Sequence, residues 1–183
     1  MASWATKWRS LPIPVSGINT PADLRGRKLA FTSPTSNSGF KGPSVLLRKE
    51  FGLEAGRDYS SVFSGKHENS IMGVANKDYD AAAIANEVMR RMVARGVVKE
   101  QQIRSIYKSS TFPTAAFGLA YNLEQSLAAK VREGFFSFQW AGTALEQEFS
   151  TLGVSKFLPI TYKQAWAVVR DVDAAMNVQY TCK

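Results

Sequence analysis

Three times in its first half, the chain passes from a short apolar run to a cluster of small polar residues and then to apolar residues at helical spacing. These strand-turn-helix units cover residues 29–51, 58–75 and 80–96. An apolar run of a few residues favours a buried strand, and apolar positions three and four residues apart favour an amphipathic helix. Because ligands bind at the carboxyl ends of strands in open α/β sheets, the three polar turns are expected to form one binding edge.

The remaining elements are predicted from the same patterning. Residues 1–17 contain interleaved prolines and favour a hinge-like extended segment, and Thr20 to Leu24 predicts a short helix with proline in its first turn. Two further strands are expected at residues 103–107 and 115–121. Residues 18–120 are therefore interpreted as an α/β lobe, and residues 121–183 as a C-terminal helical segment ending in a helix from Tyr162 to Met176.

The first polar turn is the strongest candidate for a binding site. Directly before a helix it has hydroxyl and amide side chains at Thr35, Ser36, Asn37 and Ser38, and the backbone of Gly39 follows them. The first N–H groups of a helix lack intrahelical acceptors and carry the positive end of the helix dipole, so such a turn can hold an oxyanion without a cation. The alternative is ordinary helix capping, for which serine and asparagine are common.

Two more candidates stand at the heads of the next two helices. His67, the only histidine, could donate to an anion or simply cap its own helix, and Glu87 is by default a surface acid favoured by the helix dipole. A single histidine excludes catalytic or metal sites that need two imidazoles, and no nucleophile elbow, Walker loop or dinucleotide glycine motif is present. We therefore expect no enzyme activity, no catalytic residue, no metal and no cofactor.

Composition narrows the choice of partner. The 183 residues carry a formal charge of +8 with 45% apolar content, which suits a globular protein with an anionic ligand, membrane surface or nucleic acid as partner. The basic residues are scattered and are not interleaved with aromatics, so no nucleic-acid binding is expected. The single cysteine, Cys182, permits no disulfide within the chain. No stretch is long enough to span a bilayer or to serve as the core of an export signal.

Several motifs together point to a known family. They occupy residues 23–31, 34–40, 63–67, 71–76, 80–83 and 113–118. In order and spacing this set resembles the phosphonate-binding and phosphite-binding solute receptors of ABC importers. The resemblance implies a type 2 periplasmic-binding-protein lobe, a three-layer α/β/α sandwich, that binds a small phosphorus oxyanion and docks on the importer's membrane subunits.

The resemblance also assigns roles to individual residues. The family's Ser-Thr-Ser-Gly turn falls on Ser36 to Gly39, with Asn37 in place of the threonine, and its phosphonate-contacting histidine falls on His67. The acid that holds a ligand amine would fall on Glu87. The second acid of aminoethylphosphonate receptors is absent, since residues 114–116 are Thr-Ala-Ala. The resemblance therefore favours phosphite, phosphate or methylphosphonate as the ligand.

Length is the largest departure from the family. The chain begins close to where the first hinge strand is expected, so we expect it to lack the signal peptide and most of the first lobe, although the resemblance implies a periplasmic location. An alternative interpretation is an anion-sensing or oligomerising module. In that case the exposed face of the lobe and the N-terminal tryptophans would form a homo-oligomer.

Overall fold

The computed structural model describes residues 5–12, 17–113, 116–150 and 154–179, with side chains from residue 17 onward except at 110–113. The chain forms two compact units. One is the α/β unit of Thr6–Phe112 and Ala167–Lys183, and the other is the helical unit of Met1–Ala5 and Pro113–Trp166. Each unit is described by itself.

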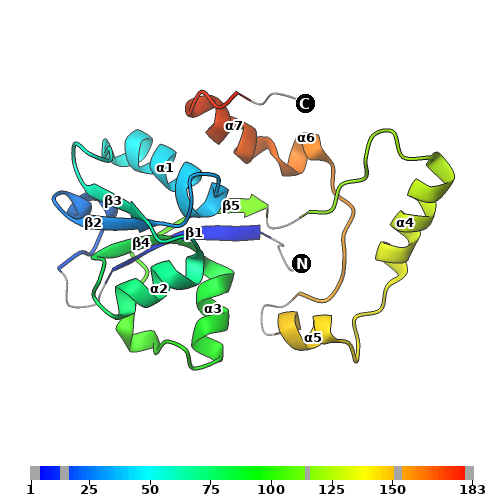
Figure 1. Cartoon of the computed structure of the whole chain (residues 1–183), viewed down its shortest axis with the longest axis horizontal. Coiled ribbons are helices and arrows are strands. Elements are labelled where there is room, and N and C mark those ends of the chain that lie inside the picture. The colour runs from blue at the N-terminus through cyan, green and yellow to red at the C-terminus, as the bar shows by residue number, and fades with distance from the viewer. Residues whose placement is uncertain (1–4, 13–16, 114–115, 151–153, 180–183) are drawn as a thin grey trace. The chain divides into compact units, whose positions relative to one another are not determined.

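The α/β unit is built on one five-stranded sheet in the order β3-β2-β4-β1-β5 (Figure 1). Its strands are β1 (Ala5–Pro12), β2 (Lys28–Phe31), β3 (Ser60–Phe63), β4 (Ala81–Ala85) and β5 (Tyr107–Pro113). Strand β2 runs parallel to β3 and β4, whereas β1 runs antiparallel to β4, with Trp8 opposite Ala85. The three parallel strands are those predicted from the strand-turn-helix pattern, so their carboxyl ends share one edge.

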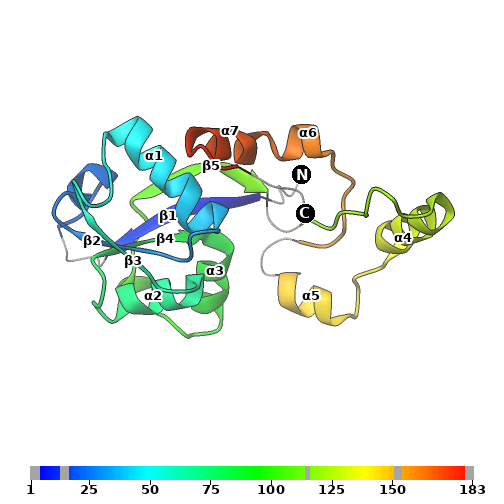
Figure 2. The ribbon, with the colours of Figure 1, turned by 45° about the horizontal axis from the view of Figure 1, so that its top comes forward.

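Helices cover both faces of this sheet. They are the 3-10 turns η1 (Pro21–Leu24) and η3 (Glu100–Gln102), the π-helical turn η2 (Asn37–Lys41), and the α-helices α1 (Gly42–Phe51), α2 (His67–Ala75), α3 (Asn86–Ala94) and α7 (Ala167–Ala175). In both ribbon views α1 and α7 lie on one side of the sheet and α2 and α3 on the other (Figures 1 and 2).

Strand side chains alternate between the two cores that result. Leu29 and Phe31 join the core that contains Leu47 of α1, whereas Ala30 joins the core that contains Ile71 of α2. Successive side chains of a strand point to opposite faces, so burial of neighbouring residues in different cores places the sheet in the middle of the unit. The predicted three-layer α/β/α lobe is confirmed.

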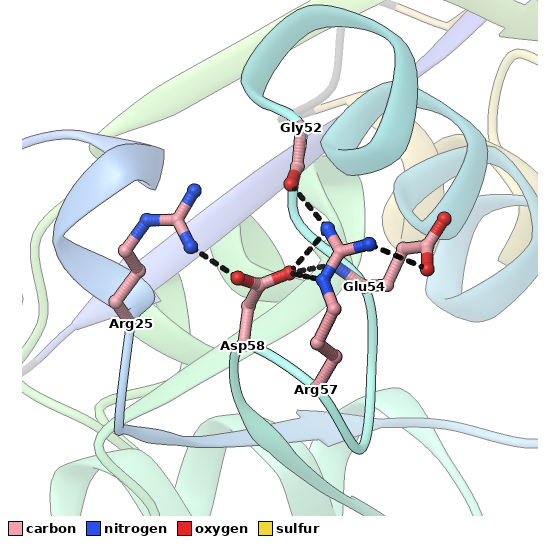
Figure 3. Close-up of polar contacts among 5 residues, drawn as sticks. All are labelled: Arg25, Gly52, Glu54, Arg57 and Asp58. Carbon is pink, nitrogen blue, oxygen red and sulfur yellow. Dashed lines mark hydrogen bonds and ion pairs between the residues drawn. The ribbon is translucent and has the colours of Figure 1, made fainter.

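A polar network fixes the connection between α1 and β3 (Figure 3). The Asp58 carboxylate accepts from the Glu54 amide at 2.9 Å and from Arg57 Nε at 2.8 Å, and it also pairs with Arg25. Arg57 in turn donates through Nη2 to the Gly52 carbonyl at 2.8 Å. The hydrogen bond from the Glu54 amide lowers the pKa of Asp58 most, and the two arginines lower it further.

The helical unit contains α4 (Gln125–Ser137), α5 (Ala144–Phe149) and α6 (Tyr162–Ala165). Aromatic rings join α4 to the segments before and after α5. Phe157 packs edge to face against both Phe135 and Trp140, with ring centroids 5.0 and 5.2 Å apart, and Trp140 is buried. No helix within the described residues is long and apolar enough to cross a membrane.

Some elements differ from the sequence prediction. One strand, β5, replaces the two expected at 103–107 and 115–121, because Ile103 packs into the α2 and α3 core from an irregular segment. The expected C-terminal helix is interrupted at Trp166, and its second half, α7, packs against α1 in the α/β unit. The start of the strand expected at residue 115 and the tryptophan at position 4 lie outside the described residues.

Candidate oxyanion site

Hydrogen bonds tie the three polar turns together at the carboxyl edge of the parallel strands. The amide of Thr32, the first residue after β2, donates to the Gly39 carbonyl at 3.1 Å, and the Gly65 amide donates to the Thr32 carbonyl at 2.8 Å. The Ala85 amide at the end of β4 donates to Nδ1 of His67 at 3.0 Å. The structure therefore brings the Ser36–Gly39 turn, His67 and the head of α3 to one edge, where the sequence placed them.

The turn after β2 is a π-helical turn that continues directly into α1. Ser36 is its N-cap, and Ser36 Oγ accepts from the Gly39 amide at 3.0 Å. The amides of Asn37 and Ser38 follow the cap and have no intrahelical acceptor, as in the first turn of any helix. Among the described residues no group pairs with the Ser38 hydroxyl, while Thr35 Oγ1 lies 3.4 Å from Ser33 Oγ. Two backbone donors and one hydroxyl thus remain for a ligand.

Gly39 owes its place to a close approach of the backbone to Thr32. A Cβ atom on Gly39 would lie 2.1 Å from Thr32 Oγ1 and 2.6 Å from its Cγ2. Thr32 is 2% exposed, and within the described residues its Oγ1 has no hydrogen-bond partner. No sequence pattern singles out Thr32, because none reports that its side chain lies under the turn.

His67 begins α2 and reaches across to the end of β4. Because Nδ1 accepts the Ala85 amide, the neutral ring carries its proton on Nε2, which is left as a donor. Burial lowers the pKa of His67, an effect that the neighbouring Glu68 partly opposes. The imidazole is therefore neutral at pH 7 in the unliganded protein. A hydrogen bond from Nε2 of His67 to a bound anion would therefore be charge-assisted by the anion alone.

Two acceptor atoms at this edge lack partners. Glu87, in the first turn of α3, is half-buried, and its Oε2 has no hydrogen-bond partner among the described residues. The Oδ1 atom of Asn37 is in the same state. A buried acceptor without a donor costs about 1 to 3 kcal/mol. No group of three histidine, cysteine, aspartate or glutamate side chains suited to a metal occurs in the part of the chain that the structure describes.

The chain is similar to a family of known proteins. Residues 14–165 match the family model described as the phosphonate periplasmic substrate-binding protein of ABC transporters. Among curated relatives, the phosphate-import protein PhnD of Mycolicibacterium smegmatis is 28% identical in a 173-residue alignment that covers 90% of this chain and 53% of that protein. The phosphonates-binding periplasmic protein of Escherichia coli K12 is 25% identical over 127 residues, covering 67% of this chain and 37% of that protein. The chain thus spans about half or less of the length of these relatives.

Solved structures show the same fold. A binding protein component of an ABC phosphonate transporter from Pseudomonas aeruginosa superposes with a TM-score of 0.77 at 21% identity, covering 98% of this chain and 63% of that one. PhnD1 of Prochlorococcus marinus, solved with methylphosphonate, also superposes with a TM-score of 0.77, at 15% identity, covering 94% of this chain and 67% of that one. The family match covers most of the chain, and the chain belongs to the family of phosphonate substrate-binding proteins of ABC transporters.

Proposed function

We propose that this lobe binds a small phosphorus oxyanion, a phosphonate, phosphite or phosphate, at the Ser36–Gly39 turn. The observation that carries the proposal is the convergence of unused donors at one edge: the amides of Asn37 and Ser38, the Ser38 hydroxyl and Nε2 of His67. A tetrahedral oxyanion presents several oxygens, and helix N-termini bind such groups through backbone amides and the helix dipole. Thr35 lies at the rim of the same turn and supplies a further hydroxyl.

Asn37 supports the proposal because one atom of its side chain has no hydrogen-bond partner. The Oδ1 atom is buried without a donor, so rotating the carboxamide by half a turn would place Nδ2 in that position. An unpartnered acceptor would then become a donor toward the oxyanion. The Asn37 carboxamide can thus supply a side-chain donor at the position where the resembling family's turn has a threonine.

Glu87 bears on the class of oxyanion. A carboxylate oxygen without a partner repels a fully ionised anion and favours a ligand that brings a hydrogen-bond donor to it. A monoprotonated phosphonate or phosphate has a P–OH group, whereas sulfate and sulfonates at neutral pH have none. We propose that Glu87 accepts a hydrogen bond from this P–OH group. An amine on the ligand would satisfy the same oxygen, which keeps aminoethylphosphonate as the second candidate.

The physiological role follows from the family. We propose that the lobe belongs to the substrate-binding component of an ABC importer, works in the periplasm and has the importer's membrane subunits as partners. Relatives named for phosphate import and for phosphonate binding support a phosphorus oxyanion as the shared ligand chemistry.

Calorimetric titration with methylphosphonate, phosphite, phosphate and aminoethylphosphonate tests the proposal. Ser38→Ala removes the free hydroxyl, and His67→Asn removes the Nε2 donor while its Oδ1 still accepts the Ala85 amide. A hydrogen bond to a charged group contributes about 1.5 to 3 kcal/mol, so each variant should bind roughly 10- to 150-fold more weakly.

The matched control is Ser155→Ala, which changes an exposed serine outside the α/β unit. It should bind like the wild type. The proposal fails if none of the four ligands produces heat above dilution, or if the Ser38 and His67 variants bind as tightly as the Ser155 variant.

A further inference from the structure

A nearly buried ion pair joins the π-helical turn to the last helix of the chain. Lys41 Nζ, in the last residue of η2, donates to Asp173 Oδ1 of α7 at 2.9 Å. The two side chains are only 12% and 10% exposed. Helix α7 lies beside α1 in both views (Figures 1 and 2). Val172, next to Asp173 in the sequence, packs with Val45 of α1.

The turn needs such external support because π-helical geometry is intrinsically unfavourable and rare. The Ser36 carbonyl accepts two amides at once, Phe40 N at 3.1 Å in the α-helical pattern and Lys41 N at 2.9 Å in the π-helical pattern. The α-helical alternative is thus already half formed. A shift of the Lys41 amide from Ser36 to the Asn37 carbonyl would tighten the turn and move the amides of Asn37 and Ser38.

Lys41 links the hydrogen bonding of the turn to helix α7. Its amide makes the π-type bond, and its ammonium group is held by a helix that lies 132 residues further along the chain. The ammonium group is paired and nearly buried. It would have to give up a charge-assisted hydrogen bond before the Lys41 backbone could rotate into the α-helical register. The cap bond from the Gly42 amide to the Asn37 carbonyl holds the other end of the turn.

We propose that Asp173 is a positioning residue for the oxyanion site: its carboxylate holds Lys41 and thereby keeps residues 37–41 in the π-helical conformation. Asp173 does not touch the ligand. The inference rests on the proposed function for its consequence in binding, but the effect on the conformation of the turn stands by itself.

Hydrogen exchange without ligand tests the conformational step. Asp173→Ala should speed the exchange of the Lys41 and Gly42 amides at least tenfold, while the amides of β2 and β4 keep their protection. Asp173→Glu, which restores the carboxylate, should recover most of the protection. Arg48→Ala is the matched control, because Arg48 Nη2 bonds the Ala175 carbonyl of the same helix at 2.7 Å without touching the turn. It should leave residues 37–42 unchanged.

Titration with methylphosphonate then tests the consequence. Asp173→Ala should weaken binding about tenfold, Asp173→Glu should restore it, and Arg48→Ala should bind like the wild type. Unchanged exchange at Lys41 and Gly42 in Asp173→Ala would overturn the inference, and so would an equal loss of protection over the whole α/β unit in both Asp173→Ala and Arg48→Ala. If the wild type bound no phosphorus oxyanion, the proposed function would fail while the exchange data still decided the role of Asp173.

Discussion

The contact between Gly39 and Thr32 makes the sharpest prediction about the site. In Gly39→Ala the new methyl carbon would lie 2.1 Å from Thr32 Oγ1, 2.6 Å from Cγ2 and 2.8 Å from Cβ. Real contacts of a Cβ atom are longer than these, and Thr32 is a short, buried side chain that has no flexible end to move aside. The turn itself must therefore shift away from β2.

The size of the effect follows from overpacking. Extra methyl groups in well-packed sites cost about 1 to 3 kcal/mol. With about 2 kcal/mol and a response of about 2 to 4 °C per kcal/mol for a chain of this size, Tm should fall by roughly 4 to 8 °C. Displacement of the Asn37 and Ser38 amides should also weaken methylphosphonate binding by at least about tenfold.

Circular dichroism melting and calorimetric titration measure the two effects. Thr32→Ala removes the two nearest atoms of the clash. The double variant with Gly39→Ala and Thr32→Ala should therefore lose about 1 kcal/mol less stability than the two single variants lose in sum. Gly134→Ala is the control, since a Cβ there meets nothing within 4 Å and Gly134 lies within α4. It should leave Tm unchanged or raise it. Wild-type Tm and affinity in Gly39→Ala would show that the close approach of Thr32 does not fix the position of the turn.

Three further predictions concern charge. Because the folded pKa of His67 lies below its ordinary value of 6.5, the unfolded state binds the proton first, and stability should fall as the pH drops below about 6.5. In thermal melts over this pH range, the Tm of His67→Asn should fall less than that of the wild type. Equal slopes of Tm against pH in the two proteins would contradict this. The pKa of Asp58 is lowered from 3.8, so its stabilisation is present above about pH 4 and is lost as the pH falls through the folded pKa; Asp58→Asn should melt lower at pH 7 and lose less on acidification, and a wild-type acid profile would count against the network's role. Glu87→Gln should reduce the preference for methylphosphonate over methanesulfonate about tenfold in competitive titration, and an unchanged ratio would remove Glu87 from the selection of ligand.

Local patterns sufficed to predict much of the fold. The apolar runs at β2 and β4 are flanked by turn residues, and Gly52 takes the left-handed φ of 62° that ends α1. These features depend on neighbours in the sequence, so periodicity and capping rules capture them. The same rules placed Ser36, His67 and the residues at the head of α3 after strand ends, and parallel strands then bring such positions to one edge.

Other features depend on contacts between distant residues. The place of β1 between β4 and β5 results from pairing over more than seventy positions, as for Trp8 with Ala85, and no local signal announces it. The strand β5 contains Ser109, which a pattern of apolar alternation assigns to a turn. The π-helical turn of residues 37–41 accompanies a close approach of Gly39 to Thr32 and the pairing of Lys41 with Asp173 in the last helix. No local sequence pattern reports either contact, so the turn type could not be predicted.

The most direct test of the account is an amide NMR titration of the chain with methylphosphonate. The largest shifts are expected at the amides of Asn37, Ser38 and Gly39 and at Nε2 of His67, with saturation at one equivalent. Shifts that are confined to other surfaces, or an unchanged spectrum at millimolar ligand, would contradict the claim that this turn is an oxyanion site.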